Sequence, residues 1–257
     1  MRLYAVKTGI VKTDDDLVDV VLDSLKAQEL QLEDNDVLAL ASKVVSYSQG
    51  RLARLSDIKP SEKAKELAKR FSLRPEFAEF ILREADKIYG GVERAVLTLK
   101  NGALTPNAGI DNKNASEGYV VLWPRDLKNW VKSFREEIKL RTGKCVGVLV
   151  VDSGLVPLRI GTVGLALAVA GFKPIRDHRN ASDLYGKRIV MTRHAVADDL
   201  ASAAHLLMGE AAEGTPVVLV RNAPVEFDDG VYGAVDMMMP SGECIFMGTL
   251  DSLSERT

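Results

Sequence analysis

Three acidic residues stand beside glycine at the ends of apolar segments: Asp111 in NAGIDNKN, Asp152 in VVDSG and Glu210 in MGEAAEG. Asp152 directly follows residues 145–151, a valine-rich run that is typical of a strand buried on both faces. A carboxylate at such a strand end is costly unless it is paired or binds a metal. Carboxylate and hydroxyl oxygens, with Ser153 among them, are ligands that Mg²⁺ and Mn²⁺ prefer. The pattern permits a divalent metal site, and it also permits an Asx turn at Asp111, a helix or turn cap at Asp152 and a solvated helix end at Glu210.

Sequence motifs indicate phosphate binding only weakly. The chain contains neither GxxxxGK[ST] nor GxGxxG after a strand. What remains is Lys43 at a predicted strand end, Asn114 near Asp111, and glycine-rich turns that offer backbone N–H groups. The three histidines lack the spacing of zinc ligands, and we expect His205 to be a packing residue inside a helix. The absence of GxSxG excludes a typical serine hydrolase.

Composition places the chain among ordinary globular proteins. Its 257 residues are 46% apolar and 27% charged, with a net charge of −2, so neither nucleic acid nor an acidic membrane surface is indicated as a partner. We expect no signal peptide, because no long apolar segment follows a basic start at the N-terminus, and the longest apolar run, residues 163–170, is too short to span a bilayer. Two distant cysteines suggest a reducing compartment, with Cys145 as a small core residue. We therefore expect a cytoplasmic protein.

The elements that would position these residues do not alternate strictly between strand and helix. Asn101-Gly102 predicts a tight hairpin turn, and glycine and alanine over residues 161–171 allow close packing. This order favours an α+β fold, a mixed β-sheet with flanking helices. Because no linker is visible, we expect a single unit over residues 1–257, either undivided or built of two intimately packed subdomains. The expected strands are residues 3–6, 36–45, 92–99, 118–123, 145–151, 188–192 and 216–220, and the expected helices end near residues 30, 71, 89, 143 and 208.

A longer series of motifs resembles one known family. In order these are ASKVVSYSQGR, NAGID, DSGLVPLRIGTVGLALAVAGF, RDHR, DLYG and VADDLASAAHLLMGEAAEGTPVVLVR, ending at Arg221. The chain is identified by them as similar to the coenzyme F420-0:L-glutamate ligases, the GTP-dependent γ-glutamyl ligases of deazaflavin biosynthesis. The resemblance implies an intertwined homodimer with an α+β fold. It also implies GTP, L-glutamate and coenzyme F420-0 as substrates, with an acyl phosphate as intermediate.

The resemblance implies roles for particular residues. Asp111, Asp152, Ser153 and Glu210 match the ligands of divalent metal, for which we expect two Mn²⁺ or Mg²⁺ ions. Asn114 matches a GTP contact. We choose Arg159 and Arg176 as catalytic candidates that grip carboxylate or phosphate, since a guanidinium fork suits both, although Arg159 could instead form a structural ion pair. The implied nucleotide-binding residues are Thr8, Gly9, Ile10, Val11, Ser42, Lys43, Tyr47, Asn114, Met208, Gly209, Glu210, Ala211, Ala212, Glu213, Gly214 and Thr215.

Two departures from the family pattern keep other functions open. Tyr47 stands where a GTP-contacting lysine is usual and Gln49 where glutamate is usual, and the segment GIVKTDDD is shorter than its counterpart. A related ligase that acts on a different carboxylate is one alternative. A homologue that binds metal and nucleotide without turnover is the other.

Overall fold

A six-stranded mixed sheet forms the centre of the protein, in a computed structural model that describes residues 1–13, 15–113 and 115–254. Its strand order is β1-β12-β2-β8-β9-β13, and β2 pairs with β8 in parallel while every other neighbouring pair is antiparallel. This confirms the predicted α+β fold with a mixed sheet. The strands are β1 (Arg2–Val6), β2 (Val37–Ala41), β8 (Gly147–Leu155), β9 (Thr162–Phe172), β12 (Val217–Arg221) and β13 (Phe227–Gly233).

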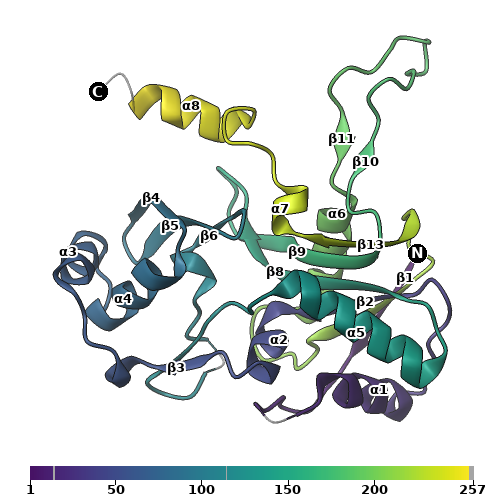
Figure 1. Ribbon diagram of the computed structural model, residues 1–257, viewed down its shortest axis with the longest axis horizontal. Helices are drawn as coiled ribbons and strands as arrows, with labels where there is room; N and C mark the ends of the chain where they lie inside the picture. The colour runs from purple at the N-terminus through teal and green to yellow at the C-terminus, as the bar shows by residue number, and fades with distance from the viewer. Residues whose placement is uncertain (14, 114, 255–257) are drawn as a thin grey trace.

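Helices cover both faces of this sheet (Figure 1). One face packs on α1 (Leu17–Ala27) and α5 (Leu127–Thr142), whose buried side chains share an apolar cluster with Val148 and Val150. The other face packs on α6 (Val196–Met208). The small residues of β9 allow α6 to approach closely, as predicted. A Cβ on Gly164 would lie only 2.2 Å from the carbonyl oxygen of Ala201 in this helix. The central strands are therefore buried on both faces.

A second lobe lies beside the sheet and carries its own apolar core (Figure 1). The chain enters it through β3 (Leu52–Arg54) and leaves through β7 (Tyr119–Val121), which pair with each other. The core of the lobe gathers Phe71, Ile81 and Val96. Its other elements are η1 (Leu55–Asp57), α3 (Glu62–Phe71), α4 (Pro75–Glu84), β4 (Lys87–Val92), β5 (Ala95–Lys100), β6 (Ala103–Pro106) and η2 (Asn107–Gly109). We refer to residues 52–110 as the α3–α4 lobe.

Two segments extend away from these layers (Figure 1). The chain between β9 and α6 forms a long arm whose base is the two-stranded pair β10 (Arg176–Asp177) and β11 (Arg193–His194). After β13 come the short helix α7 (Ala234–Met237) and then α8 (Ile245–Ser254), near the C-terminal end of the chain. Among the residues described, no helix combines the length and the apolar character needed to cross a membrane.

Several predicted boundaries were wrong. The strand expected over residues 36–45 ends at Ala41, and helix α2 (Ser42–Ser48) begins at once. The strand expected over residues 145–151 begins at Gly147 and continues to Leu155, so Cys145 precedes it and is partly exposed. Residues 188–192 do not form a strand, and residues 87–92, predicted as a helix end and a break, form β4. As a result, Ser42 and Lys43 lie on helix α2 rather than on a strand, and Asp152 and Ser153 lie within strand β8 rather than after it.

Candidate functional site

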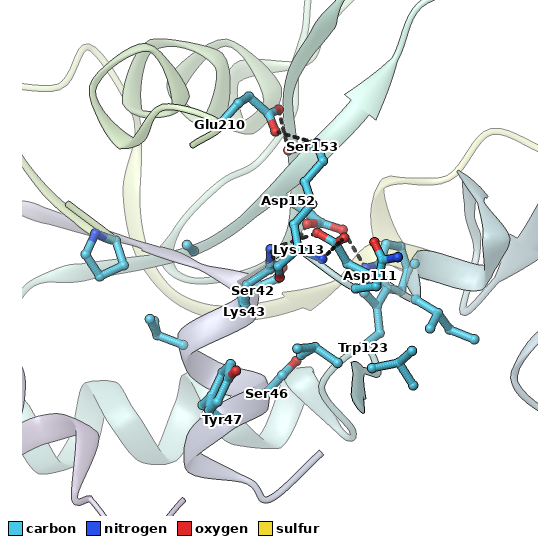
Figure 2. Close-up of a pocket in the computed structure, with 18 of the residues that line it drawn as sticks. Ser42, Lys43, Ser46, Tyr47, Asp111, Lys113, Trp123, Asp152, Ser153 and Glu210 are labelled. Atoms are coloured by element: carbon cyan, nitrogen blue, oxygen red, sulfur yellow. Dashed lines mark hydrogen bonds and ion pairs between the residues drawn. The ribbon is translucent and has the colours of Figure 1, made fainter. Parts of the chain in front are cut away.

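A cavity of about 1200 Å³ brings most of the predicted site residues together between the sheet and the α3–α4 lobe. The three segments predicted to bind nucleotide line it: residues 8–11, the start of α2, and residues 208–215. Asp111, Asp152, Ser153 and Tyr47 line it as well. Asn114 lies outside the described residues. Figure 2 shows Asp111 and Asp152 near the N-terminal end of α2, and Glu210 beside Ser153.

The parallel pairing of β2 with β8 places Ser42 beside Asp152. Ala41, the last residue of β2, is in register with Val151, so Ser42 lies beside Asp152, which continues strand β8 past the end of β2. The Ser42 hydroxyl donates to Asp152 Oδ1 at 2.8 Å. Because α2 begins here, its first turn also points Lys43 toward the cavity.

The second oxygen of Asp152 is held by a tryptophan that the sequence did not single out. Trp123 Nε1 donates to Asp152 Oδ2, and the indole is buried against Gly109. Gly109 has φ of +70°, and a Cβ there would lie 2.2 Å from the indole nitrogen, so only glycine fits. Burial raises the pKa of Asp152 despite the two hydrogen bonds, because it disfavours the charged carboxylate.

Asp111 lies on the opposite wall and is paired with Lys43. Lys43 Nζ lies 2.7 Å from Asp111 Oδ2 and 3.2 Å from the carbonyl oxygen of Lys113. The backbone of Asp111 is fixed by two hydrogen bonds with Val121, at the end of β7. Asp111 is thus held against β7, the strand through which the chain returns from the α3–α4 lobe.

Glu210 and Ser153 form a second polar cluster with His205 and Thr162. Glu210 Oε1 accepts from Ser153 Oγ at 2.8 Å and from Thr162 Oγ1 at 2.5 Å, and it lies 2.9 Å from His205 Nε2. Burial acts to raise the pKa of Glu210, but the hydrogen bonds from Thr162, Ser153 and His205 outweigh it and hold the pKa below its usual value.

His205 was predicted to be a packing residue, and this was wrong. It lines the cavity and lies 3.3 Å from Ser153 Oγ. The helix that carries it ends at Met208, and Gly209 turns the chain so that Glu210 faces back toward the last helical turn. Nothing in the spacing of histidines could have indicated this contact, since the partners lie on a strand and on a turn.

The donors around the cavity are chemically suited to a hard divalent cation. They are carboxylate and hydroxyl oxygens, which Mg²⁺ and Mn²⁺ prefer to nitrogen or sulfur. As the side chains stand, no three His, Cys, Asp or Glu residues of the described ranges are grouped closely enough to enclose an ion. The cation that faces Asp111 here is Lys43.

Neither catalytic arginine candidate lines the cavity. Arg159 lies at the exposed tip of the β8–β9 hairpin, beyond Leu155 and Thr162, which do line it. Arg176 lies at the base of the arm, where its guanidinium donates to the carbonyl oxygen of Pro224 at 2.8 Å. The geometry of a single chain therefore gives these two residues no contact with the carboxylates.

Comparison with known proteins defines the class to which this fold and cavity belong. The profile of the F420-0:Gamma-glutamyl ligase family matches residues 5–222, so the chain belongs to that family. It is 39% identical to the coenzyme F420:L-glutamate ligase of Methanopyrus kandleri over 85% of both chains. It is 36% identical to the protein of the same name from Methanothermobacter thermautotrophicus, over 93% of this chain and 95% of that one. A third, from Archaeoglobus fulgidus, is 37% identical over 84% of this chain and 85% of its own.

Proposed function

We propose that this protein is a GTP- and divalent-metal-dependent ligase that joins L-glutamate to coenzyme F420-0. Its family membership and the names of its relatives support the ligase activity and the two substrates. The observation that carries the proposal furthest is the cavity itself. There Asp111, Asp152 and Glu210 lie together with the segments that the family resemblance assigns to the nucleotide.

Binding of the nucleotide would depend on two kinds of group. Residues 8–11 and 209–215 form irregular segments that line the cavity, and backbone N–H groups of such segments can cradle phosphate oxygens. Lys43 and Lys113 add positive charge on the same side of the cavity, where Lys113 Nζ lies 3.9 Å from Glu210 Oε2. Both lysines already face carboxylates, so they would help to balance the charge of the site when phosphate enters.

The residues that would hold divalent metal are Asp111, Asp152, Ser153 and Glu210. Bound there, Mg²⁺ or Mn²⁺ would neutralise phosphate charge and orient the phosphoryl group for in-line transfer. Ser42 and Trp123 fix the direction of the Asp152 carboxylate, and Thr162 with His205 fixes that of Glu210. Oriented ligands of this kind reduce the reorganisation that binding requires.

The reaction needs activation because an amine does not attack a carboxylate at neutral pH. Transfer of the γ-phosphoryl group to the terminal carboxylate of coenzyme F420-0 breaks the bond to the bridging oxygen and releases GDP. The amino group of L-glutamate then attacks the acyl carbon, phosphate leaves, and the nitrogen loses a proton. The buried walls around Asp152 would keep water from the acyl phosphate.

Incubation with GTP, Mn²⁺, L-glutamate and coenzyme F420-0, followed by mass analysis of the products, tests the proposal. We expect the acceptor to gain the mass of one or more glutamates while GDP is released. GDP release without conjugate would favour a ligase for another carboxylate. Nucleotide binding without GDP release would favour a homologue without turnover. Either outcome contradicts the proposal.

A further inference from the structure

The cavity continues beyond the nucleotide segments into the α3–α4 lobe. Its volume of about 1200 Å³ exceeds the roughly 300–1,000 Å³ that is typical for a single small ligand. Leu73, Phe77 and Pro106 give this half apolar walls. The charged residues that the lobe contributes to the lining are Arg74 and Arg94, and no carboxylate is among them. The carboxylates belong to the other half, so the two halves differ in charge.

The fold brings these two arginines to one corner. Helix α3 ends at Phe71, Ser72 adopts the left-handed conformation with φ of +54°, and Arg74 precedes the first residue of α4. Arg94 lies in the turn between β4 and β5, and its N–H donates to the carbonyl oxygen of Phe71 at 2.7 Å. The β-turn is thereby fixed to the end of α3, three residues before Arg74.

The guanidinium groups of Arg74 and Arg94 form no close ion pair with a described carboxylate. In the part of the chain that the structure describes, no carboxylate lies within 4.0 Å of the Arg94 side chain. Arg74 has a long contact of 3.7 Å with Glu76, and its side chain is 66% exposed. Both groups can therefore accept an anion, and a guanidinium binds a carboxylate or a phosphate through two parallel hydrogen bonds.

The same corner is connected to the reaction centre by a short segment. Residues 105–107 line the cavity on the side of the lobe, and the chain then passes through η2 to Asp111 within four residues. Thr98 and Val96 fix this segment, because the Thr98 hydroxyl accepts from the Ala108 N–H and the Val96 N–H donates to Asn107 Oδ1. A ligand that lies along the lobe would thus have one end beside the carboxylates.

We propose that the lobe half of the cavity is the acceptor site. It would take a molecule with an apolar or aromatic body and a negatively charged group, with the body on Leu73 and Phe77 and the anion between Arg74 and Arg94. The carboxylate to be activated would extend past residues 105–107 toward Asp111. This inference rests on the proposed function for the identity of the acceptor, coenzyme F420-0.

The test compares Arg74→Gln, Arg94→Gln and the double variant with the wild type. Arg54→Gln is a matched control, since Arg54 is an exposed arginine of the same lobe that does not line the cavity. Calorimetric titration with coenzyme F420-0 and, separately, with GTP and Mn²⁺ gives the two dissociation constants. Circular dichroism confirms that each variant is folded, and Phe77→Leu tests the apolar wall without removing charge.

We expect each arginine variant to weaken acceptor binding by about tenfold or more, because a hydrogen bond to a charged group is lost. GTP binding and the control variant should remain unchanged. An unchanged dissociation constant for the acceptor in the double variant would overturn the proposal. So would weakening of GTP binding to the same extent, which would place the arginines at the nucleotide, or failure of the wild type to bind the acceptor.

Turnover distinguishes this inference from the proposed function. If the wild type binds coenzyme F420-0 through these arginines but forms no amide, the acceptor site stands and the ligase activity fails. If the wild type forms the amide and the KM for the acceptor is the same in the double variant, the ligase activity stands and the acceptor site fails.

Discussion

Asp152 carries the most specific expectation about a single residue. We expect Asp152→Asn to reduce metal-dependent activity by about a hundredfold or more while the protein stays folded, since the amide keeps the shape but loses the charge that a divalent ion needs. Activity measured over a range of Mn²⁺ concentrations, with circular dichroism as the check on folding, gives the answer.

Asp198→Asn is the matched control for this change. Asp198 is also largely buried, its pKa is also raised by burial, and it accepts a hydrogen bond from the Ala166 N–H outside the cavity. The control should keep its activity whatever its effect on stability. Full activity of Asp152→Asn at ordinary Mn²⁺ concentration would rule out Asp152 as a ligand.

Tyr47 is the subject of a second prediction about a single residue. Helix α2 places Tyr47 one turn after Lys43, so the two side chains are neighbours on one helical face, and both line the cavity. In an extended segment the side chains of Lys43 and Tyr47 would instead lie roughly 13 Å apart. A lysine at position 47 would bring a second cation to the phosphate side, next to a lysine whose charge is already balanced by Asp111.

We therefore expect Tyr47→Lys to tighten GTP binding by about 1–2 kcal/mol, the low end of the value of charge-assisted hydrogen bonds. Calorimetric titration with GTP and Mn²⁺ at one salt concentration measures the change. Tyr47→Phe is the control, because it removes the hydroxyl and adds no charge. Binding that is unchanged or weaker in Tyr47→Lys would show that the phosphate site is built around other residues.

The sequence indicated some site residues and not others for a physical reason. Asp111 and Asp152 each stand two residues from a glycine in a short polar stretch, and such a pattern is visible along the chain. The contributions of Trp123 and His205 arise from contacts between residues 29 and 52 positions apart in sequence. An aromatic residue before a proline and a histidine in an alanine-rich helix have ordinary packing roles in most contexts, so neither type nor spacing distinguishes them.

At the scale of elements, the prediction of a strand over residues 36–45 was wrong where helix α2 begins. The run DVLALASKVV is apolar and β-branched toward its end, which favours a strand over its whole length. The strand ends at Ala41 instead, and the helix that follows has no side-chain hydrogen bond at its N-cap. Val45 is buried in the main core. Tertiary packing, rather than local propensity, decides the conformation here.

Glu79 joins two helices and supports a prediction about pH. In α4 it accepts hydrogen bonds from the N–H and hydroxyl of Ser61, the N-cap of α3, and from Arg83. These contacts lower the pKa of Glu79 from 4.5 to about 2. Between these values the unfolded chain binds more protons than the folded one, so the free energy of unfolding rises with pH through this window.

We expect Glu79→Gln to flatten that rise and to cost about 1–2 kcal/mol at pH 6. Urea unfolding at several pH values from 2.5 to 6 (roughly the window set by the shifted and unshifted pKa values) measures it. Glu62→Gln is the control, because Glu62 is an exposed residue of the first turn of α3 whose only described ion pair is with Lys65. A parallel loss of stability at every pH would mean that the hydrogen bonds matter and the charge does not.

For the whole molecule, the apolar periodicity predicted the central strands and the helices that cover them. The α3–α4 lobe was harder to predict, because its strands are short and its chain enters and leaves through the paired strands β3 and β7 rather than through a linker. For the arm between β9 and α6, the sequence predicted a strand over residues 188–192, which the structure does not contain. The arm projects from the body in Figure 1, and its outer side chains are largely exposed, a tertiary feature that its composition does not reveal.

Exposed apolar side chains on the arm support the predicted homodimer. Leu184, Tyr185, Val190 and Met191 are between 74% and 100% exposed. At the tip of the β8–β9 hairpin, at the other end of β9 from the arm, Leu158 and Ile160 are fully exposed as well. Large apolar side chains that are this exposed on projecting segments are typical of surfaces that another molecule covers. Arg159 and Arg176 lie on the same two segments, so a second copy would also place both arginines in an interface.

We expect light scattering at micromolar concentration to give twice the mass of the chain. Replacement of both Leu184 and Tyr185 by glutamate should shift the protein toward monomer, because charged side chains would have to be buried in the interface. Leu140→Glu is the control, since Leu140 is 80% exposed on α5, away from the arm. A wild-type protein that is monomeric at this concentration would contradict the expected dimer. A dimer that persists unchanged in the double variant would instead place the interface elsewhere, and the exposed arm would then need a different partner to explain its apolar surface.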